Sequence, residues 1–123
     1  ICSDHSPVNE DNKLKPFAES EHGASSVELL IPMVFKLSEE YKIDLGLLIN
    51  KITHIPANIL EINKGNLSIN SDADICIFDP NYSWEVNAKT LISEGKNTPF
   101  MNANFIGKVS STIFNGNIVF ISQ

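Results

Sequence analysis

The sequence has 123 residues, of which 42% are hydrophobic and 20% charged, a balance typical of one globular domain. Its 15 acidic residues outnumber its 9 basic ones, and the net charge of −6 disfavours binding to nucleic-acid phosphates or anionic membrane surfaces. With no apolar run near the roughly 20 residues of a membrane span and no signal-peptide pattern, the chain is expected to be cytoplasmic.

The first quarter of the chain has no regular periodicity. Ile1-Cys2 followed by Ser3-Asp4 looks like the end of a strand whose beginning is missing, and the chain does not start with Met, so we expect a piece of a longer protein. Residues 6–24 contain two prolines, a glycine and many charges, a composition that predicts a long loop. Loops of this length are usually functional or disordered.

An amphipathic helix is predicted from Ser25 onward. Ser25 and Glu28 match a capping box, in which each side chain satisfies a free backbone N–H of the first turn. Pro32 lies beyond that turn and lacks an N–H, so we expect a kink or break there. The apolar side chains recur at three- and four-residue spacings and form a stripe of Val27, Leu30, Ile31, Val34 and Phe35.

Two shorter helices should follow. Asp44 is a plausible N-cap for a helix from Leu45 to about Ile52. Thr53 with Pro56 indicates a further helix that ends near Leu60.

After residue 63 the pattern becomes that of β-strands. Asn66–Ile69 alternates between polar and apolar residues, and Ile75–Phe78 is an apolar run that we expect to be a strand covered on both faces and ended by Asp79-Pro80. Cys76 within it should be a small buried hydrophobe, and with Cys2 so far away both thiols should be reduced. Trp84 and Val86 alternate with polar neighbours as another short strand.

The clearest local signal is near the end of the chain. Residues 108–114 and 117–121 flank Asn115-Gly116, the pair favoured in a tight type I′ hairpin. Because the helical patterns come first and the strand patterns second, the sequence predicts an α+β fold class.

Several motifs together give the chain a family resemblance. Ser3-Asp4-His5-Ser6-Pro7 resembles the Asp-His-Ala-Pro-His motif that ends the eighth barrel strand of dihydroorotases, in the amidohydrolase superfamily. Further stretches follow the order of that family's C-terminal region: Pro16-Phe17, Gly23, residues 28–32, 65–67, 72–80, 84–86, 97–100 and 107–109.

The resemblance implies the C-terminal part of a metal-dependent hydrolase with a (β/α)₈ (TIM) barrel. Residues 1–62 would be the end of that barrel, with the end of strand 8, an active-site loop and the last helices. Residues 63–123 would be the C-terminal part of a small composite β domain. Since such a barrel needs about 250 residues, most of it would lie upstream.

The resemblance also implies roles for individual residues. Asp4 would bind zinc and act as general base, while His22 and Gly23 stand where the family's Pro-Gly contacts the substrate ring. Val8 replaces a His that binds the substrate carboxylate, so Val8→His is expected to raise the activity of the full-length protein. The other zinc ligands lie upstream, and the three histidines show no metal-ligand spacing. We therefore expect this chain alone to bind no zinc and to be inactive.

Two functions stay open at this point. One is a catalytic dihydroorotase of pyrimidine biosynthesis, which interconverts dihydroorotate and N-carbamoyl-L-aspartate. The other is a non-catalytic dihydroorotase-like subunit that associates with aspartate transcarbamoylase, and the sequences around Asp4 and residues 16–21 look more like this group. A hydantoinase or allantoinase fits the motifs less well.

The apolar stripe on residues 27–35 needs a cover, so we expect its side chains at an interface, for example in a homo-oligomer, or unusually exposed.

Overall fold

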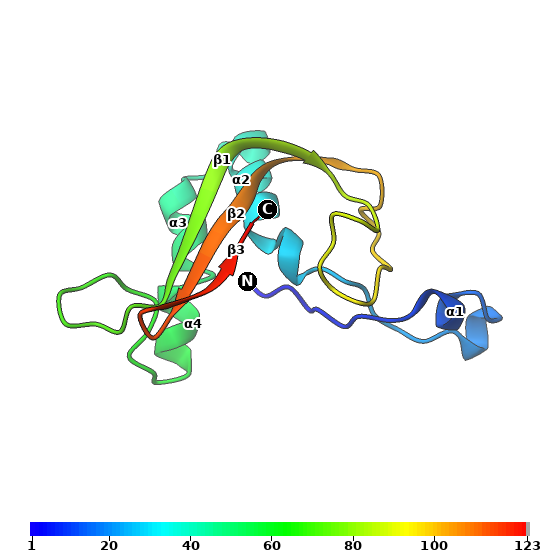
Figure 1. The fold of residues 1–123 in the computed structure, drawn as a ribbon, viewed down its shortest axis with the longest axis horizontal. Coiled ribbons are helices and arrows are strands. Elements are labelled where there is room, and N and C mark those ends of the chain that lie inside the picture. Colours follow the sequence, from blue (N-terminus) through cyan, green and yellow to red (C-terminus); the bar gives the residue numbers. More distant parts are fainter. Residues whose placement is uncertain (123) are drawn as a thin grey trace.

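The computed structural model describes residues 1–122 and places a group of helices before an antiparallel three-stranded sheet (Figure 1). This order agrees with the predicted α+β arrangement. The sheet has the strand order β1-β2-β3, so each strand pairs with its neighbour in sequence. The elements are α1 (Glu10–Lys13), α2 (Leu30–Tyr41), α3 (Leu45–Asn50), α4 (His54–Ile59), β1 (Ile75–Glu85), β2 (Asn104–Phe114), β3 (Asn117–Ile121) and the 3₁₀ turns Phe17–Glu19 and Val27–Leu29.

The predicted C-terminal hairpin is confirmed. β2 and β3 are joined by Asn115 and Gly116, whose φ angles of 47° and 77° are both positive, as a type I′ turn requires. Asn tolerates this left-handed region and Gly occupies it freely, so these two residues set the register of the hairpin.

β1 differs from the prediction, because the two expected short strands form one strand. Asp79 pairs with Lys108 and Ser83 pairs with Ile106, so residues 80–82 lie opposite Gly107 alone. This bulge accommodates Pro80, which has no N–H to donate to the ladder. The Asp79 carboxylate accepts a hydrogen bond from the N–H of Asn81 at 2.9 Å, which closes the bulge locally.

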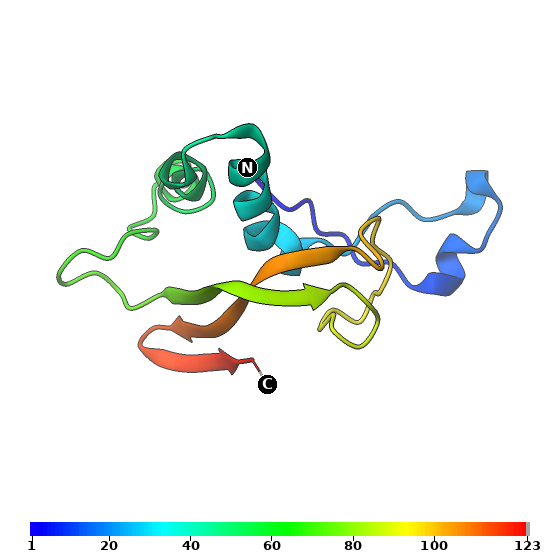
Figure 2. The same cartoon turned by 90° about the horizontal axis from the view of Figure 1, so that it is seen from above.

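The prediction that Ile75–Phe78 is covered on both faces is wrong. Ile77 is 48% exposed and Cys76 is also exposed, although partial burial raises the pKa of its thiol. The helices explain the difference, because α2 packs against β2 and lies with α3 on one side of the sheet (Figure 2). Phe78 points to the covered side, where its ring centroid lies 4.5 Å from that of Phe35.

The strand expected at Asn66–Ile69 is absent from the described structure, and this segment is an exposed loop. The side chain of Asn66 accepts hydrogen bonds from the N–H of Ser68 at 3.0 Å and from the hydroxyl of Ser71 at 2.6 Å. These local bonds fold the backbone into a turn, and Asn side chains commonly compete with strand pairing in this way.

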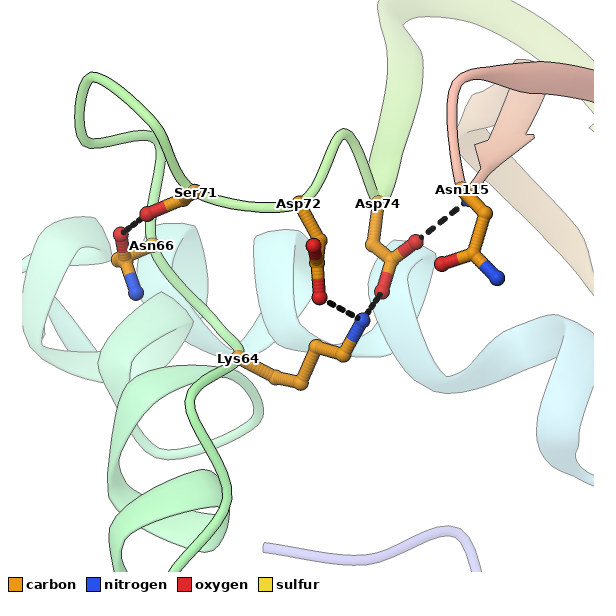
Figure 3. A network of polar contacts seen from close by, with 6 residues as sticks. All are labelled: Lys64, Asn66, Ser71, Asp72, Asp74 and Asn115. Atoms are coloured by element: carbon orange, nitrogen blue, oxygen red, sulfur yellow. Dashed lines mark hydrogen bonds and ion pairs between the residues drawn. The ribbon is translucent and has the colours of Figure 1, made fainter.

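The loop then connects to the hairpin through an ionic network (Figure 3). Lys64 Nζ lies 2.7 Å from a carboxylate oxygen of Asp72 and 2.6 Å from one of Asp74. The other oxygen of Asp74 accepts the N–H of Asn115 at 2.8 Å. That backbone bond and Lys64 lower the pKa of Asp74, while hydrogen bonds to Asp72 and Asp74 raise the pKa of Lys64.

The helix boundaries agree largely with the sequence patterns. The predicted break near Pro32 is confirmed, since a 3₁₀ turn over Val27–Leu29 precedes α2 and Pro32 lies in the first turn of that helix. The predicted N-cap of α3 is confirmed as well, because Asp44 Oδ1 accepts the N–H of Leu47 at 2.8 Å. α4 begins at His54 and ends at Ile59, close to the expected bounds.

A small core lies between the 3₁₀ turn before α2, the segment that follows β1 and the start of β2, and it is formed by the buried residues Leu29, Val86, Leu91 and Phe105. The apolar stripe on residues 27–35 is only partly used. Val34 is 3% exposed, whereas Val27 is 50% exposed and the other three side chains are intermediate. The expectation of unusual exposure is therefore right for Val27 and wrong for Val34.

Among residues 1–122, no helix has the length and apolarity needed to cross a membrane.

Candidate functional site

One open hollow of about 480 Å³ brings together the three residues that the sequence singled out. Asp4, His22 and Gly23 all line it. They come from two segments, residues 3–6 and 22–26, which are separated by an excursion over residues 9–21 that carries α1. The remaining lining residues are Ser3, Ser6, Ala24, Ser26, Pro99 and Phe100.

The two segments are held side by side by hydrogen bonds. The N–H of Ser6 donates to the carbonyl of Ala24 at 3.0 Å, and the hydroxyl of Ser26 donates to the carbonyl of Ser3 at 2.7 Å. These bonds lie on either side of Asp4 in the sequence. The carboxylate of Asp4 is therefore presented on a braced backbone.

Gly23 is required by its close approach to the first segment. Its φ is +127°, outside the range that L side chains usually adopt, and a Cβ there would lie 2.4 Å from the carbonyl oxygen of Ser6. Any side chain at this position would push the two segments apart, so a glycine sets the width of the hollow.

A third segment, residues 92–100, completes the hollow. The N–H of Ser25 donates to the carbonyl of Asn97 at 2.7 Å, and Asn97 Nδ2 donates to the carbonyl of Gly23 at 3.2 Å. The hydroxyl of Ser25 donates to the carbonyl of Gly95. These contacts fix the segment whose Pro99 and Phe100 contribute to the wall of the hollow.

The predicted capping box at Ser25 and Glu28 is wrong. Ser25 uses its hydroxyl for Gly95, and the two carboxylate oxygens of Glu28 accept the N–H groups of Ile92 and Ser93, each at 2.7 Å. Both side chains thus bind a segment more than 60 positions away instead of the helix start. These tertiary contacts replace the local cap because two charge-assisted hydrogen bonds to otherwise free N–H groups stabilise the fold more than one capping hydrogen bond does.

His5 provides the missing cap. Its Nδ1 accepts the N–H of Ser26 at 3.0 Å and that of Val27 at 3.2 Å, at the start of the 3₁₀ turn before α2. Sequence reasoning missed this role, because imidazole is not a usual capping group and the donors lie 21 and 22 positions away.

Asp4 can supply one carboxylate to a metal ion but cannot hold it alone. Within residues 1–122, no three His, Cys, Asp or Glu side chains are grouped so that they could ligate a metal. His5 is engaged with the start of α2 through Nδ1, and His22 is exposed on the rim. The donor set of this chain therefore does not fit a complete zinc site, which needs three or four ligands.

The structure gives no support to the expected role of position 8. Val8 is 5% exposed and does not line the hollow. Its backbone lies against Gly95, where an added Cβ would come within 2.9 Å of the Val8 nitrogen. The substitution Val8→His would therefore place an imidazole in a packed site.

Comparison with known proteins agrees with this geometry. The model of the amidohydrolase family matches residues 1–119. The chain is 35% identical over 119 residues to the dihydroorotase of Geotalea daltonii, covering 97% of this chain and 28% of that protein. It is also 35% identical over 118 residues to a dihydroorotase-like protein of Pseudomonas aeruginosa, covering 96% of this chain and 28% of that protein.

The fold is also that of a solved relative, the dihydropyrimidinase of Brevibacillus agri. The two superimpose with a TM-score of 0.87 at 25% identity, over 96% of this chain and 27% of that one. The chain thus spans little more than a quarter of the length of these relatives. The family model, the fold and the hollow around Asp4 lead to one conclusion: the chain belongs to the amidohydrolase family and resembles its dihydroorotases.

Proposed function

We propose that this chain is the C-terminal part of a dihydroorotase of pyrimidine biosynthesis, which hydrolyses the cyclic amide of dihydroorotate reversibly to N-carbamoyl-L-aspartate. The observation that supports the proposal is the meeting of Asp4, His22 and Gly23 around one open hollow. The dihydroorotases among its relatives, at about 35% identity, supply the substrate class.

In this proposal Asp4 is the general base. Its carboxylate accepts a proton from the attacking water, a bond forms between the water oxygen and the ring carbonyl carbon, and the carbon–nitrogen bond of the ring breaks. The proton then passes to the departing nitrogen, and the new carboxylic acid group releases the second water proton to solvent, so the single product is the ring-opened N-carbamoyl-L-aspartate. An exposed carboxylate on a braced backbone suits this role, because the group must reach the reacting atoms without moving its support.

The substrate would rest against Gly23 and His22. The backbone of Gly23 lines the hollow, and its missing Cβ is what lets the segment of Ser6 lie against it. His22 is exposed beside it and offers a polar ring to substrate oxygens. Residues 1–62 would then be the end of the catalytic barrel and residues 63–123 part of the β domain. Zinc would be held by Asp4 together with ligands from the upstream residues.

A turnover assay on the full-length protein tests this function. We expect interconversion of dihydroorotate and N-carbamoyl-L-aspartate, about one or two zinc ions per active site, and a loss of at least about a thousandfold in kcat for Asp4→Asn. Asp11→Asn is the matched control, because this exposed carboxylate lies on the excursion and outside the hollow. Equal activity of Asp4→Asn and wild type would contradict the proposal, and one zinc bound to the isolated 123-residue chain would contradict the need for upstream ligands.

A second function is favoured by a specific observation. Two relatives, at 35% and 36% identity, are named dihydroorotase-like proteins. In this alternative the full-length protein is a non-catalytic subunit that associates with aspartate transcarbamoylase. It predicts no turnover, no retained zinc and co-purification with aspartate transcarbamoylase. Inspection of the upstream sequence for a His-x-His pair, a metal-bridging Lys and two further His residues separates the two alternatives.

A further inference from the structure

We infer that His5 is a positioning residue for Asp4. It holds the general base over the hollow through a bond to the start of the following helix. The inference rests on the proposed function for its catalytic consequence, but its geometric part stands by itself. His5 is half-buried, whereas the other two histidines, His22 and His54, are exposed.

The contacts of His5 define the state of its ring. Nδ1 accepts two backbone N–H groups, from Ser26 at 3.0 Å and Val27 at 3.2 Å. A ring nitrogen that accepts carries no proton, so the proton of the neutral ring lies on Nε2. The imidazole therefore acts as a fixed acceptor that joins the residue after Asp4 to the first turn before α2.

The residues around Asp4 are all joined to residues 24–27. The carbonyl of Ser3 accepts the hydroxyl of Ser26 at 2.7 Å, the ring of His5 accepts the N–H groups of Ser26 and Val27, and the N–H of Ser6 donates to Ala24. None of these bonds uses the carboxylate of Asp4, which remains available to the hollow. Among these contacts between described residues, His5 is the only residue of segment 3–6 that takes part through its side chain.

The backbone of Asp4 explains why such bracing is needed. Its φ is +50°, in the left-handed region that residues other than Gly adopt at an energetic cost, which is smaller for Asp than for most side chains. Residues in such conformations persist where the surrounding structure fixes them, and they concentrate at functional sites. Without the His5 bond, the peptide units beside Asp4 lose one of their attachments, and the extended conformation becomes accessible.

Three substitutions in the full-length protein separate positioning from bulk packing. In His5→Asn the amide Oδ1 occupies the place of Nδ1 and can accept the same N–H groups. In His5→Gln the amide reaches the place of Nε2 instead, so the acceptor is misplaced. In His5→Leu the acceptor is removed while apolar bulk remains.

We expect His5→Leu and His5→Gln to lower kcat about tenfold to a hundredfold, because the partner that orients a metal- or proton-binding group typically contributes that much. KM should change little, since His5 does not line the hollow. His5→Asn should recover most of kcat. If His5→Leu retains kcat within about twofold of wild type, or if Gln restores it as well as Asn, the inference is overturned.

Crystal structures of the same variants give a readout that needs no activity. Asp4 should leave the left-handed region in His5→Leu and remain there in His5→Asn. In a separate NMR measurement on wild type, the ring ¹⁵N signals of His5 should show the proton on Nε2. An unchanged Asp4 backbone in His5→Leu would overturn the inference. If wild type itself turns nothing over, the proposed function fails, while these structures still decide the role of His5.

Discussion

The carboxylate of Glu28 accepts the backbone N–H of Ser93 at 2.7 Å, although the two residues are 65 positions apart in the sequence. The second oxygen of Glu28 accepts the N–H of Ile92 at the same distance. This bidentate contact holds the segment between β1 and β2 against the first turn before α2. The wall of the hollow that includes Pro99 and Phe100 therefore depends on a side chain of this 3₁₀ turn, which itself lies outside the hollow.

Removal of the Glu28 carboxylate should release that segment. Glu28→Ala is expected to lower the free energy of unfolding by about 1–2 kcal/mol, because it removes two charge-assisted hydrogen bonds, of which the one to Ile92 is exposed and the one to Ser93 is partly buried. Glu28→Gln keeps one acceptor oxygen and should lose about half as much. Hydrogen exchange of the full-length protein checks this directly, since the amides of Ile92 and Ser93 should exchange faster in the Ala variant. Unchanged exchange at these two amides would count against it.

Gly23→Ala should be far more harmful than the same change at another glycine of positive φ. Gly116 has a φ of +77° with nothing within 4 Å of an added Cβ, so Gly116→Ala should cost roughly 1–2 kcal/mol of conformational energy. At Gly23 the added Cβ also meets the carbonyl of Ser6 at 2.4 Å, which should cost roughly 1–3 kcal/mol more. Urea unfolding of the two variants measures the difference, and equal losses would contradict the close approach.

Asp74 should make stability depend on pH in the acid range. Its folded pKa lies below the ordinary value of 3.8, chiefly because it accepts the N–H of Asn115 and also because it contacts Lys64. A carboxyl whose folded pKa is lowered stabilises the fold above its unfolded pKa, and this contribution disappears as the pH falls through the folded value. The stability difference between wild type and Asp74→Asn should therefore be constant at neutral pH and shrink below 3.8.

Lys64→Met is the matched variant for that experiment. It leaves the bond from Asn115 to Asp74, the larger cause of the lowered pKa, and should retain more of the acid dependence than Asp74→Asn. Thermal unfolding midpoints recorded across the acid range give both curves. Parallel curves for wild type and Asp74→Asn would show that the carboxylate is not stabilised in the fold.

Val8→His should reduce stability and not raise activity, in contrast to the expectation from the family motif. Val8 is buried beside Gly95, and an imidazole there has to lose its water without a polar partner, which costs roughly 1–3 kcal/mol. Val8→Ala is the control for lost packing alone. A Val8→His protein with higher catalytic efficiency than wild type would contradict this and would support a match between this position and the family's substrate-binding His.

Local signals in the sequence predicted the parts of the fold that local interactions determine. The Asn115-Gly116 turn, the Asp44 cap and the break at Pro32 each depend on backbone preferences within a few residues. Predictions that depended on which elements pack against a segment were wrong. The apolar run at Ile75–Phe78 looked fully buried, but the helices lie on one side of the sheet only, so Ile77 remains exposed.

The same distinction applies to the site. Asp4, His22 and Gly23 were found through a motif resemblance, and the structure places them around one hollow. The roles of His5, Ser25 and Glu28 could not be read from the sequence, because their partners lie between 21 and 70 positions away. Side chains that brace a site leave no local pattern, since their spacing is set by the chain's path and not by helix or strand geometry.

The excursion over residues 9–21 stands out from the body of the molecule, and Phe17 within it is 96% exposed (Figures 1 and 2). Its two ends are held together by the bond from Ser6 to Ala24, so the relation between Asp4 and Gly23 does not depend on what lies between them. Loop-closure entropy changes slowly with length, and doubling such a loop costs only about 0.6 kcal/mol. Insertions, deletions and substitutions in the excursion thus change the free energy of folding little. The excursion can differ between related proteins and so alter what enters the hollow, while the carboxylate of Asp4 and the backbone of Gly23 keep their places.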